Sequence, residues 1–171
     1  GLGSLAINIL SQSGYKVIAA TGKTHEAGYF RQLGAETIID RTETNDHSGK
    51  LLLRPRWAGA IDTVGGNILS TAIRACQRHG NVASCGNALS PEFETSVFPF
   101  ILNGINLLGI DSATCPMPLR KYIWDKLADD WRPEMLTSIS HEISLNELPE
   151  NIDLMLKGKI KGRVFVNLID A

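Results

Sequence analysis

The residues with the clearest chemical pattern are Thr21, Gly22 and Lys23, which directly follow a short, mainly apolar run at positions 16–20. A hydroxyl, a free backbone amide and an ammonium group in succession suit a phosphate as ligand. Arg41 follows the next apolar run along the chain, and its guanidinium could hold the same phosphate with two parallel hydrogen bonds. These residues predict a site for a phosphate group, and the 2′-phosphate of NADP(H) fits it.

An acidic residue is missing from the same turn. A site specific for NAD places Asp or Glu after this strand to accept hydrogen bonds from the ribose hydroxyls, whereas this chain has a lysine there. Glu26 is the only nearby acid in the sequence, and its place suits the first turn of a helix. Lys23 and Arg41 could also be ordinary solvated charges, but their positions together favour NADP(H) as the cofactor.

The start of the chain carries part of a second phosphate-binding element. Gly1, Leu2 and Gly3 precede a helical pattern, so the backbone amides of Gly1 and Leu2 and the helix dipole could hold a pyrophosphate. A full dinucleotide fingerprint has three glycines after a strand, and here the strand and the first part of the loop are absent. We therefore expect the chain to begin partway through its phosphate-binding loop.

Two further turns contain glycine. Gly65 and Gly66 follow Asp62, and they could let the backbone approach a cofactor or could only make a tight turn. Gly86 and Asn87 leave the same choice open, because Asn87 could hydrogen-bond a cofactor or simply adopt a left-handed backbone conformation. In a doubly wound sheet all these turns would lie at the edge where ligands bind.

No catalytic residue and no metal ligand can be assigned from the sequence. The cysteines stand at 76, 85 and 115 and the histidines at 25, 47, 79 and 141. Neither set has the spacing of a metal site, so we expect no bound metal. Cys85 and Cys115 have no partnered base, which favours a buried or loop thiol over a nucleophile.

The composition excludes several classes of partner. Seventeen basic and eighteen acidic residues leave a net charge of −1, so no overall field favours nucleic acid or an anionic membrane. The apolar stretches are shorter than the ~20 residues that a membrane span needs, and no signal peptide opens the chain. Widely spaced cysteines in odd number suit a reducing compartment. We therefore expect a cytoplasmic protein that acts on a small-molecule substrate.

Alternating helix and strand patterns would position these residues. Apolar residues at three- and four-residue spacing predict helices at 2–10, 25–33, 67–76, 119–130 and 145–157. Short apolar runs predict strands at 16–20, 37–40, 58–62, 81–85, 105–110 and 163–168. Ser144 and Glu147 form a candidate capping box for the last helix. The pattern predicts one doubly wound, Rossmann-like α/β domain over 1–171 with a parallel sheet that lacks its first strand.

Seven stretches, spread in order through nearly the whole chain, resemble the medium-chain dehydrogenase/reductase family. Within that family they are similar to the quinone-oxidoreductase-like YhdH/AcuI group of acrylyl-CoA reductases. The stretches cover residues 21–23, 39–41, 56–66, 97–102, 108–112, 142–145 and 161–163. The Trp-Ala-Gly sequence at 57–59 and the Pro-Phe-Ile-Leu sequence at 99–102 are the most specific of them.

The resemblance implies an NADPH-dependent, zinc-independent reductase of an activated double bond, with acrylyl-CoA as the substrate of the group and quinones as a historical label. It implies contacts to the 2′-phosphate at Thr21, Gly22, Lys23 and Arg41. It also implies later cofactor contacts at Asn87, Ile101, Ser112 and Gly158. The family typically has a larger apolar residue in place of Asn87 and often a polar side chain in place of Gly158.

The resemblance further implies parts of a full-length enzyme that lie outside this chain. A GroES-like N-terminal domain supplies much of the substrate pocket, and the first strand lies at the centre of the sheet. Without that strand its two neighbours would have unpaired edges, so we expect a homo-oligomer that forms through exposed sheet edges. The reaction would be hydride transfer from nicotinamide to an enoyl thioester, with the protein orienting the cofactor.

Three other functions stay open on the sequence. The chain could be a non-catalytic nucleotide-binding or assembly fragment of such an enzyme. A methyltransferase-like domain also opens with a glycine-rich loop, but it needs an acid where the Thr-Gly-Lys turn stands. A zinc alcohol dehydrogenase is possible in principle, because its metal ligands would lie upstream.

Overall fold

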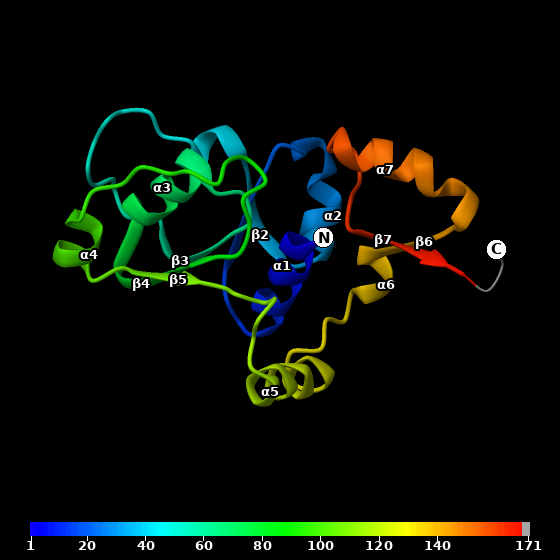
Figure 1. The fold of residues 1–171 in the computed structure, drawn as a ribbon. Coiled ribbons are helices and arrows are strands. Elements are labelled where there is room, and N and C mark those ends of the chain that lie inside the picture. The colour runs from blue at the N-terminus through cyan, green and yellow to red at the C-terminus, as the bar shows by residue number, and fades with distance from the viewer. Residues whose placement is uncertain (169–171) are drawn as a thin grey trace.

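The strands of the molecule pair in parallel, in a computed structural model that describes residues 1–168 (Figure 1). The strands are β1 (Val17–Thr21), β2 (Ala35–Asp40), β3 (Trp57–Asp62), β4 (Cys76–Ser84), β5 (Asn106–Gly109), β6 (Ser140–Ser144) and β7 (Arg163–Asn167). The α-helices are α1 (Leu2–Gln12), α2 (Ala27–Gln32), α3 (Gly66–Arg74), α4 (Phe98–Asn103), α5 (Met117–Ala128), α6 (Leu136–Ile139) and α7 (Leu148–Leu156). Short 3-10 helices are η1 (Thr24–Glu26), η2 (Arg41–Thr44) and η3 (Leu145–Glu147).

The strands of the described residues form three sheets: β1 with β2, β3 with β4 and β5, and β6 with β7. The register aligns the carboxyl ends of neighbouring strands, because Thr21 pairs with Asp40 and Asp62 pairs with Ser84. Within residues 1–168 no pairing joins β1 to β3. The predicted Rossmann-like α/β fold is confirmed.

The β1–β2 sheet and the β3–β5 sheet each pack on their own apolar cluster. The first cluster joins α1, α2 and the β1–β2 sheet, and Leu33 is fully buried in it. The second joins α3 to β4 and β5 around Ile73 and Val82, which are also fully buried. Gly34 has a φ of +100°, and a Cβ there would lie 2.1 Å from the Ser11 Oγ, so the turn into β2 requires glycine.

The irregular segment between η2 and β3 is held by a buried arginine. Arg74 at the end of α3 pairs with Asp46 at 3.0 Å, and its side chain is 8% exposed. Its guanidinium also donates to the carbonyls of Lys50 at 2.8 Å and Asp46 at 3.0 Å. Asn67 donates to the side chain of Asn45 at 2.8 Å. These contacts fix the segment that follows β2 against the helix that follows β3.

The structure adds elements that the sequence patterns miss. Helix α4 begins with Phe98 and has proline in its first turn, and β6 is a five-residue strand with little apolar character. The helix predicted at 67–76 ends at Arg74 instead, because Cys76 already pairs with Trp57 as the start of β4. Ser144 and Glu147 do form the predicted capping box, but it opens the 3-10 helix η3, which leads into α7.

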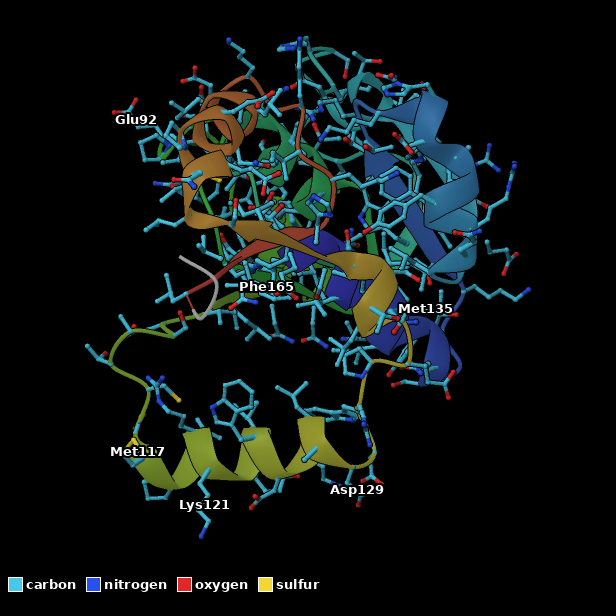
Figure 2. All side chains as sticks on the ribbon, turned by 90° about the vertical axis from the view of Figure 1, so that its right-hand side faces the viewer. Glu92, Met117, Lys121, Asp129, Met135 and Phe165 are labelled. Carbon is cyan, nitrogen blue, oxygen red and sulfur yellow. The ribbon has the colours of Figure 1, made fainter. Side chains whose placement is uncertain are left out.

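Helix α5 lies apart from the rest of the molecule. None of its residues is buried, and Figure 2 shows it below the other elements with Lys121 pointing away from them. In Figure 1 it lies on the opposite side of the β3–β5 sheet from α3. No helix among residues 1–168 is long and apolar enough to cross a membrane.

Candidate nucleotide-binding site

The turn after β1 exposes polar groups at the end of the strand. The backbone amide of Lys23 donates to the Thr21 hydroxyl at 3.0 Å, which folds the turn back on itself. Gly22 at its centre is exposed, and Lys23 is partly buried. The turn therefore offers a backbone position without a side chain between a hydroxyl and an ammonium group.

Arg41 lies directly over Gly22. A Cβ added to Gly22 would be 2.9 Å from the Arg41 Nε and 3.0 Å from its Nη2. The pairing of Thr21 with Asp40 explains this contact, because the residues that follow two aligned parallel strands become neighbours. Among residues 1–168 no carboxylate lies within 4.0 Å of the Arg41 guanidinium. The structure thus brings the predicted residues of both turns together, and within residues 1–168 the Arg41 guanidinium has no ion pair.

The Asp40 carboxylate, at the end of β2, accepts hydrogen bonds from the turn that follows it. The Asp40 carboxylate accepts hydrogen bonds from the Thr42 amide at 2.9 Å and from the Thr42 hydroxyl at 2.7 Å. The backbone hydrogen bond and then the hydroxyl lower the pKa of Asp40 below its ordinary value. This carboxylate caps η2, so one of its oxygens is already used within the chain.

The loop after α7 packs against the same turn. The Lys23 ammonium donates to the carbonyl of Ile160, and the Gly1 backbone nitrogen donates to the carbonyl of Gly162. The Lys161 ammonium lies 2.9 Å from the Glu26 carboxylate. The start of α1, the Thr-Gly-Lys turn and the 158–163 loop are therefore one region, although they are far apart in sequence.

Gly1 and Leu2 lie where the sequence places them, at the N-terminus of α1. Gly1 is the N-cap, and its carbonyl accepts from the amides of Ser4 at 3.1 Å and Leu5 at 3.3 Å. The first turn contains no acidic residue that would oppose an anion. A pyrophosphate contact at Gly1 and Leu2 stays a prediction, and the Gly1 nitrogen already donates to the Gly162 carbonyl.

The glycines after β3 serve loop packing. The Asp62 carboxylate accepts from the Gly65 amide at 3.0 Å and from the Val64 amide at 3.3 Å. A Cβ on Gly65 would lie 2.2 Å from the Ser90 carbonyl oxygen, and Gly65 has a φ of +71°. Of the two interpretations that the sequence leaves open, these contacts favour the tight turn.

The thiol at the end of β4 is not an activated nucleophile. The Cys85 Sγ donates to the Asp62 carbonyl at 3.0 Å. Burial, and then the Asp62 charge, raise the pKa of this thiol above its ordinary value. Burial also raises the pKa of Asp62, although its backbone hydrogen bonds oppose the shift. A thiol with a raised pKa is mostly protonated at neutral pH, which agrees with the predicted structural role.

The four later positions implied by the family resemblance are more scattered. Asn87 is exposed beside Gly65, and its backbone is not left-handed, so that explanation of Asn87 is wrong. Ser112 lies beyond the carboxyl end of β5, and its carbonyl accepts from Arg120 at 2.7 Å. Gly158 follows the C-cap of α7 with a φ of +66°, which accounts for glycine at this position.

Ile101 is not brought to this edge of the sheet. It is 68% exposed on α4. The neighbouring Gly104 lies against the His79 ring, with 2.8 Å from its would-be Cβ to the Nδ1. His79 precedes the part of β4 that pairs with β5, so α4 lies at the amino ends of these strands. A contact of Ile101 with cofactor bound at the carboxyl ends has no support from this placement.

Sequence reasoning missed Ile160 and Lys161 as parts of this region. The signal that could have found Lys161 is its place in the 161–163 stretch that resembles the family, but no spacing argument links it to Glu26. Residues 1–168 contain no group of three or more His, Cys, Asp and Glu side chains that could hold a metal ion.

Comparisons with known proteins find relatives of this chain among oxidoreductases. Residues 1–129 match the family model described as zinc-binding dehydrogenase. The quinone oxidoreductase-like protein YhfP of Bacillus subtilis (strain 168) is 40% identical over 169 residues, which cover 98% of this chain and 51% of YhfP. Acrylyl-CoA reductase AcuI of Ruegeria pomeroyi is 37% identical over 168 residues, which cover 98% of this chain and 51% of AcuI.

Solved structures show the same likeness. The crystal structure of Bacillus subtilis YhfP with NAD bound superposes with a TM-score of 0.93 at 40% identity, over 98% of this chain and 51% of that one. The YhdH oxidoreductase from Salmonella enterica, in complex with NADP, has a TM-score of 0.93 at 34% identity with the same coverage. The chain therefore spans about half the length of the relatives that it matches.

Proposed function

The chain belongs to the zinc-binding dehydrogenase family, and from this premise we propose that it is the NADPH-binding part of a zinc-independent oxidoreductase. The single observation that carries the choice of cofactor is the Arg41 guanidinium, which lies over Gly22 and has no carboxylate partner within 4.0 Å among residues 1–168. A bidentate arginine is the side chain best suited to a phosphate monoester. Bacillus subtilis YhfP was crystallised with NAD, which has no 2′-phosphate. The contact with the 2′-phosphate is therefore the part of the proposal to test.

The residues present fit both the 2′-phosphate and the pyrophosphate of this cofactor. Arg41, Lys23 and the Thr21 hydroxyl would hold the 2′-phosphate, beside a glycine that leaves room for it. The first turn of α1, with Gly1 and Leu2, would hold the pyrophosphate. We keep Asn87, Ser112 and Gly158 as proposed contacts further along the cofactor. Ile101 is retained only as an implication of the family, since its helix lies at the other end of the strands.

When bound, the reduced nicotinamide supplies a hydride for an electron-poor double bond. The chain's own residues would bind the adenosine end tightly and so fix the position of the reacting end. No acid or base among residues 1–168 is assigned to proton transfer. Residues of the full-length protein outside this chain would complete the substrate pocket and orient the substrate.

We propose acrylyl-CoA or a similar enoyl thioester as the substrate, on the strength of the likeness to AcuI. We also propose a homo-oligomer that forms through exposed sheet edges. Strand β5 is one such edge, and its Leu108 and the following Ile110 are 45% and 52% exposed.

Turnover by the full-length protein tests the proposed reaction. Acrylyl-CoA should cause the loss of NADPH absorbance, and propionyl-CoA should be the product seen by mass spectrometry. Crotonyl-CoA, which carries one more methyl group, serves as the comparison substrate. NADPH binding without oxidation of the cofactor by either thioester would refute the proposed substrate class, and would favour a non-catalytic nucleotide-binding role.

A further inference from the structure

Lys161 contacts the region of the Thr-Gly-Lys turn from the opposite end of the chain. Its ammonium lies 2.9 Å from the Glu26 carboxylate and donates a hydrogen bond to it. The same ammonium lies 5.0 Å from the centre of the Tyr29 ring. An acid and an aromatic face both favour a cation at this point. The position of the Lys161 charge is therefore defined by two partners.

Glu26 is the acid that stands beside the phosphate-binding turn. Its amide donates to the Lys23 carbonyl at 2.9 Å, so η1 continues directly from the turn. The hydrogen bond from Lys161 lowers the pKa of Glu26, and the charges of Lys161, His25 and Lys23 add to the shift. Glu26 is thus ionised at neutral pH, and it is near enough to Lys23 for the two charges to interact. A phosphate held by Lys23 would experience the same negative charge.

We propose that Lys161 is a positioning residue for nucleotide specificity, which pairs Glu26 and so prevents its charge from repelling the 2′-phosphate. The inference rests on the proposed function, because it places the 2′-phosphate at the Thr-Gly-Lys turn. Lys161 itself would not touch the nucleotide. Its role explains how the turn tolerates an acid three residues beyond Lys23.

The size of the effect follows from the charges. If the carboxylate and a doubly charged phosphate are about 9 Å apart in water, their repulsion weakens binding about fivefold at low salt. NADH carries no 2′-phosphate, so its affinity should change by less than about twofold. Added salt at ~0.5 M should remove most of the difference, because the screening length then falls to a few ångströms.

The test is a set of nucleotide titrations on the full-length protein, with NADPH and NADH fluorescence as the readout. Lys161→Met should weaken NADPH binding about fivefold and lower the NADPH-to-NADH selectivity by the same factor. Glu26→Gln combined with Lys161→Met should restore the selectivity of the wild type. Lys159→Met is the matched control, because it removes an exposed lysine of the same loop without touching Glu26.

Several results would overturn the inference. Lys161→Met could weaken both nucleotides equally, the double variant could keep the loss, or Lys159→Met could have the same effect as Lys161→Met. The first two would mean that Lys161 only supports the loop. Wild-type protein that binds neither nucleotide would refute the proposed function as well, whereas normal binding with unchanged selectivity in Lys161→Met would refute the inference alone.

Discussion

Replacing Gly22 with alanine should weaken NADPH binding by displacing Arg41. The new methyl group would lie 2.9 Å from the Arg41 Nε and 3.1 Å from its Cζ, which is well inside the ~3.5 Å at which nonbonded heavy atoms pack. Gly22 is not among the glycines with positive φ, so alanine does not strain the backbone. Arg41 is exposed, and its guanidinium is free to move aside. The substitution should therefore cost little stability and act on the site alone.

The displacement of the Arg41 guanidinium determines how much NADPH affinity is lost. A guanidinium moved by half an ångström or more should lose one of two parallel hydrogen bonds to a phosphate, and a charge-assisted hydrogen bond contributes about 1.5–3 kcal/mol. A loss of about 1.4 kcal/mol corresponds to a tenfold change in the dissociation constant. We expect Gly22→Ala to raise the Kd of NADPH about tenfold and that of NADH by no more than about twofold.

Fluorescence titration of the full-length variants measures both constants. Arg41→Ala should weaken NADPH binding at least as much, and Gly22→Ala should have no further effect in the Arg41→Ala background. Gly28→Ala is the control, because nothing lies within 4 Å of its would-be Cβ and its φ is not positive. Additive effects of Gly22→Ala and Arg41→Ala, or unchanged NADPH affinity in Gly22→Ala, would refute the reasoning.

The remaining predictions concern the ion pair between buried Arg74 and Asp46, whose side chain is 28% exposed. Arg74→Met should lower the free energy of unfolding by about 3 kcal/mol and the Tm by about 10 °C. The control Arg78→Met, at an exposed position, should change the free energy of unfolding by less than about 0.5 kcal/mol. Equal effects of the two substitutions in urea unfolding would contradict this prediction. Hydrogen bonds from Ser48 and then Arg74 lower the pKa of Asp46 from 3.8, so its contribution to stability is complete above that value and is lost as the pH falls through the folded pKa. The stability difference between wild type and Asp46→Asn should therefore shrink in acid, and a difference independent of pH would argue against the pair.

The central part of the site could be predicted from the sequence for a simple reason. Thr21 and Arg41 each follow an apolar run, and parallel pairing aligns the ends of neighbouring strands, so local patterns were enough to bring them together. The same logic identified most of the strands and helices. It needed no knowledge of long-range contacts beyond the parallel pairing itself.

Other features depend on contacts that no local pattern encodes. Strand β6 is polar and short, and it exists because it pairs with β7 across more than twenty residues. Lys161 reaches Glu26 from a distant loop, and their sequence spacing carries no signal. Gly65 had two plausible roles until its contact with the Ser90 carbonyl showed how the loops pack. The domain was predicted over residues 1–171, and its last three residues, 169–171, lie outside the part of the chain that the structure describes.

The most direct test of the central claim compares the affinities of the full-length protein for NADPH and NADH, before and after Arg41→Ala. The proposed site predicts that wild type binds NADPH at least about tenfold more tightly, and that Arg41→Ala removes most of this preference while leaving NADH binding unchanged. Equal affinities in the wild type, or a preference that survives Arg41→Ala, would contradict the assignment of this turn to the 2′-phosphate.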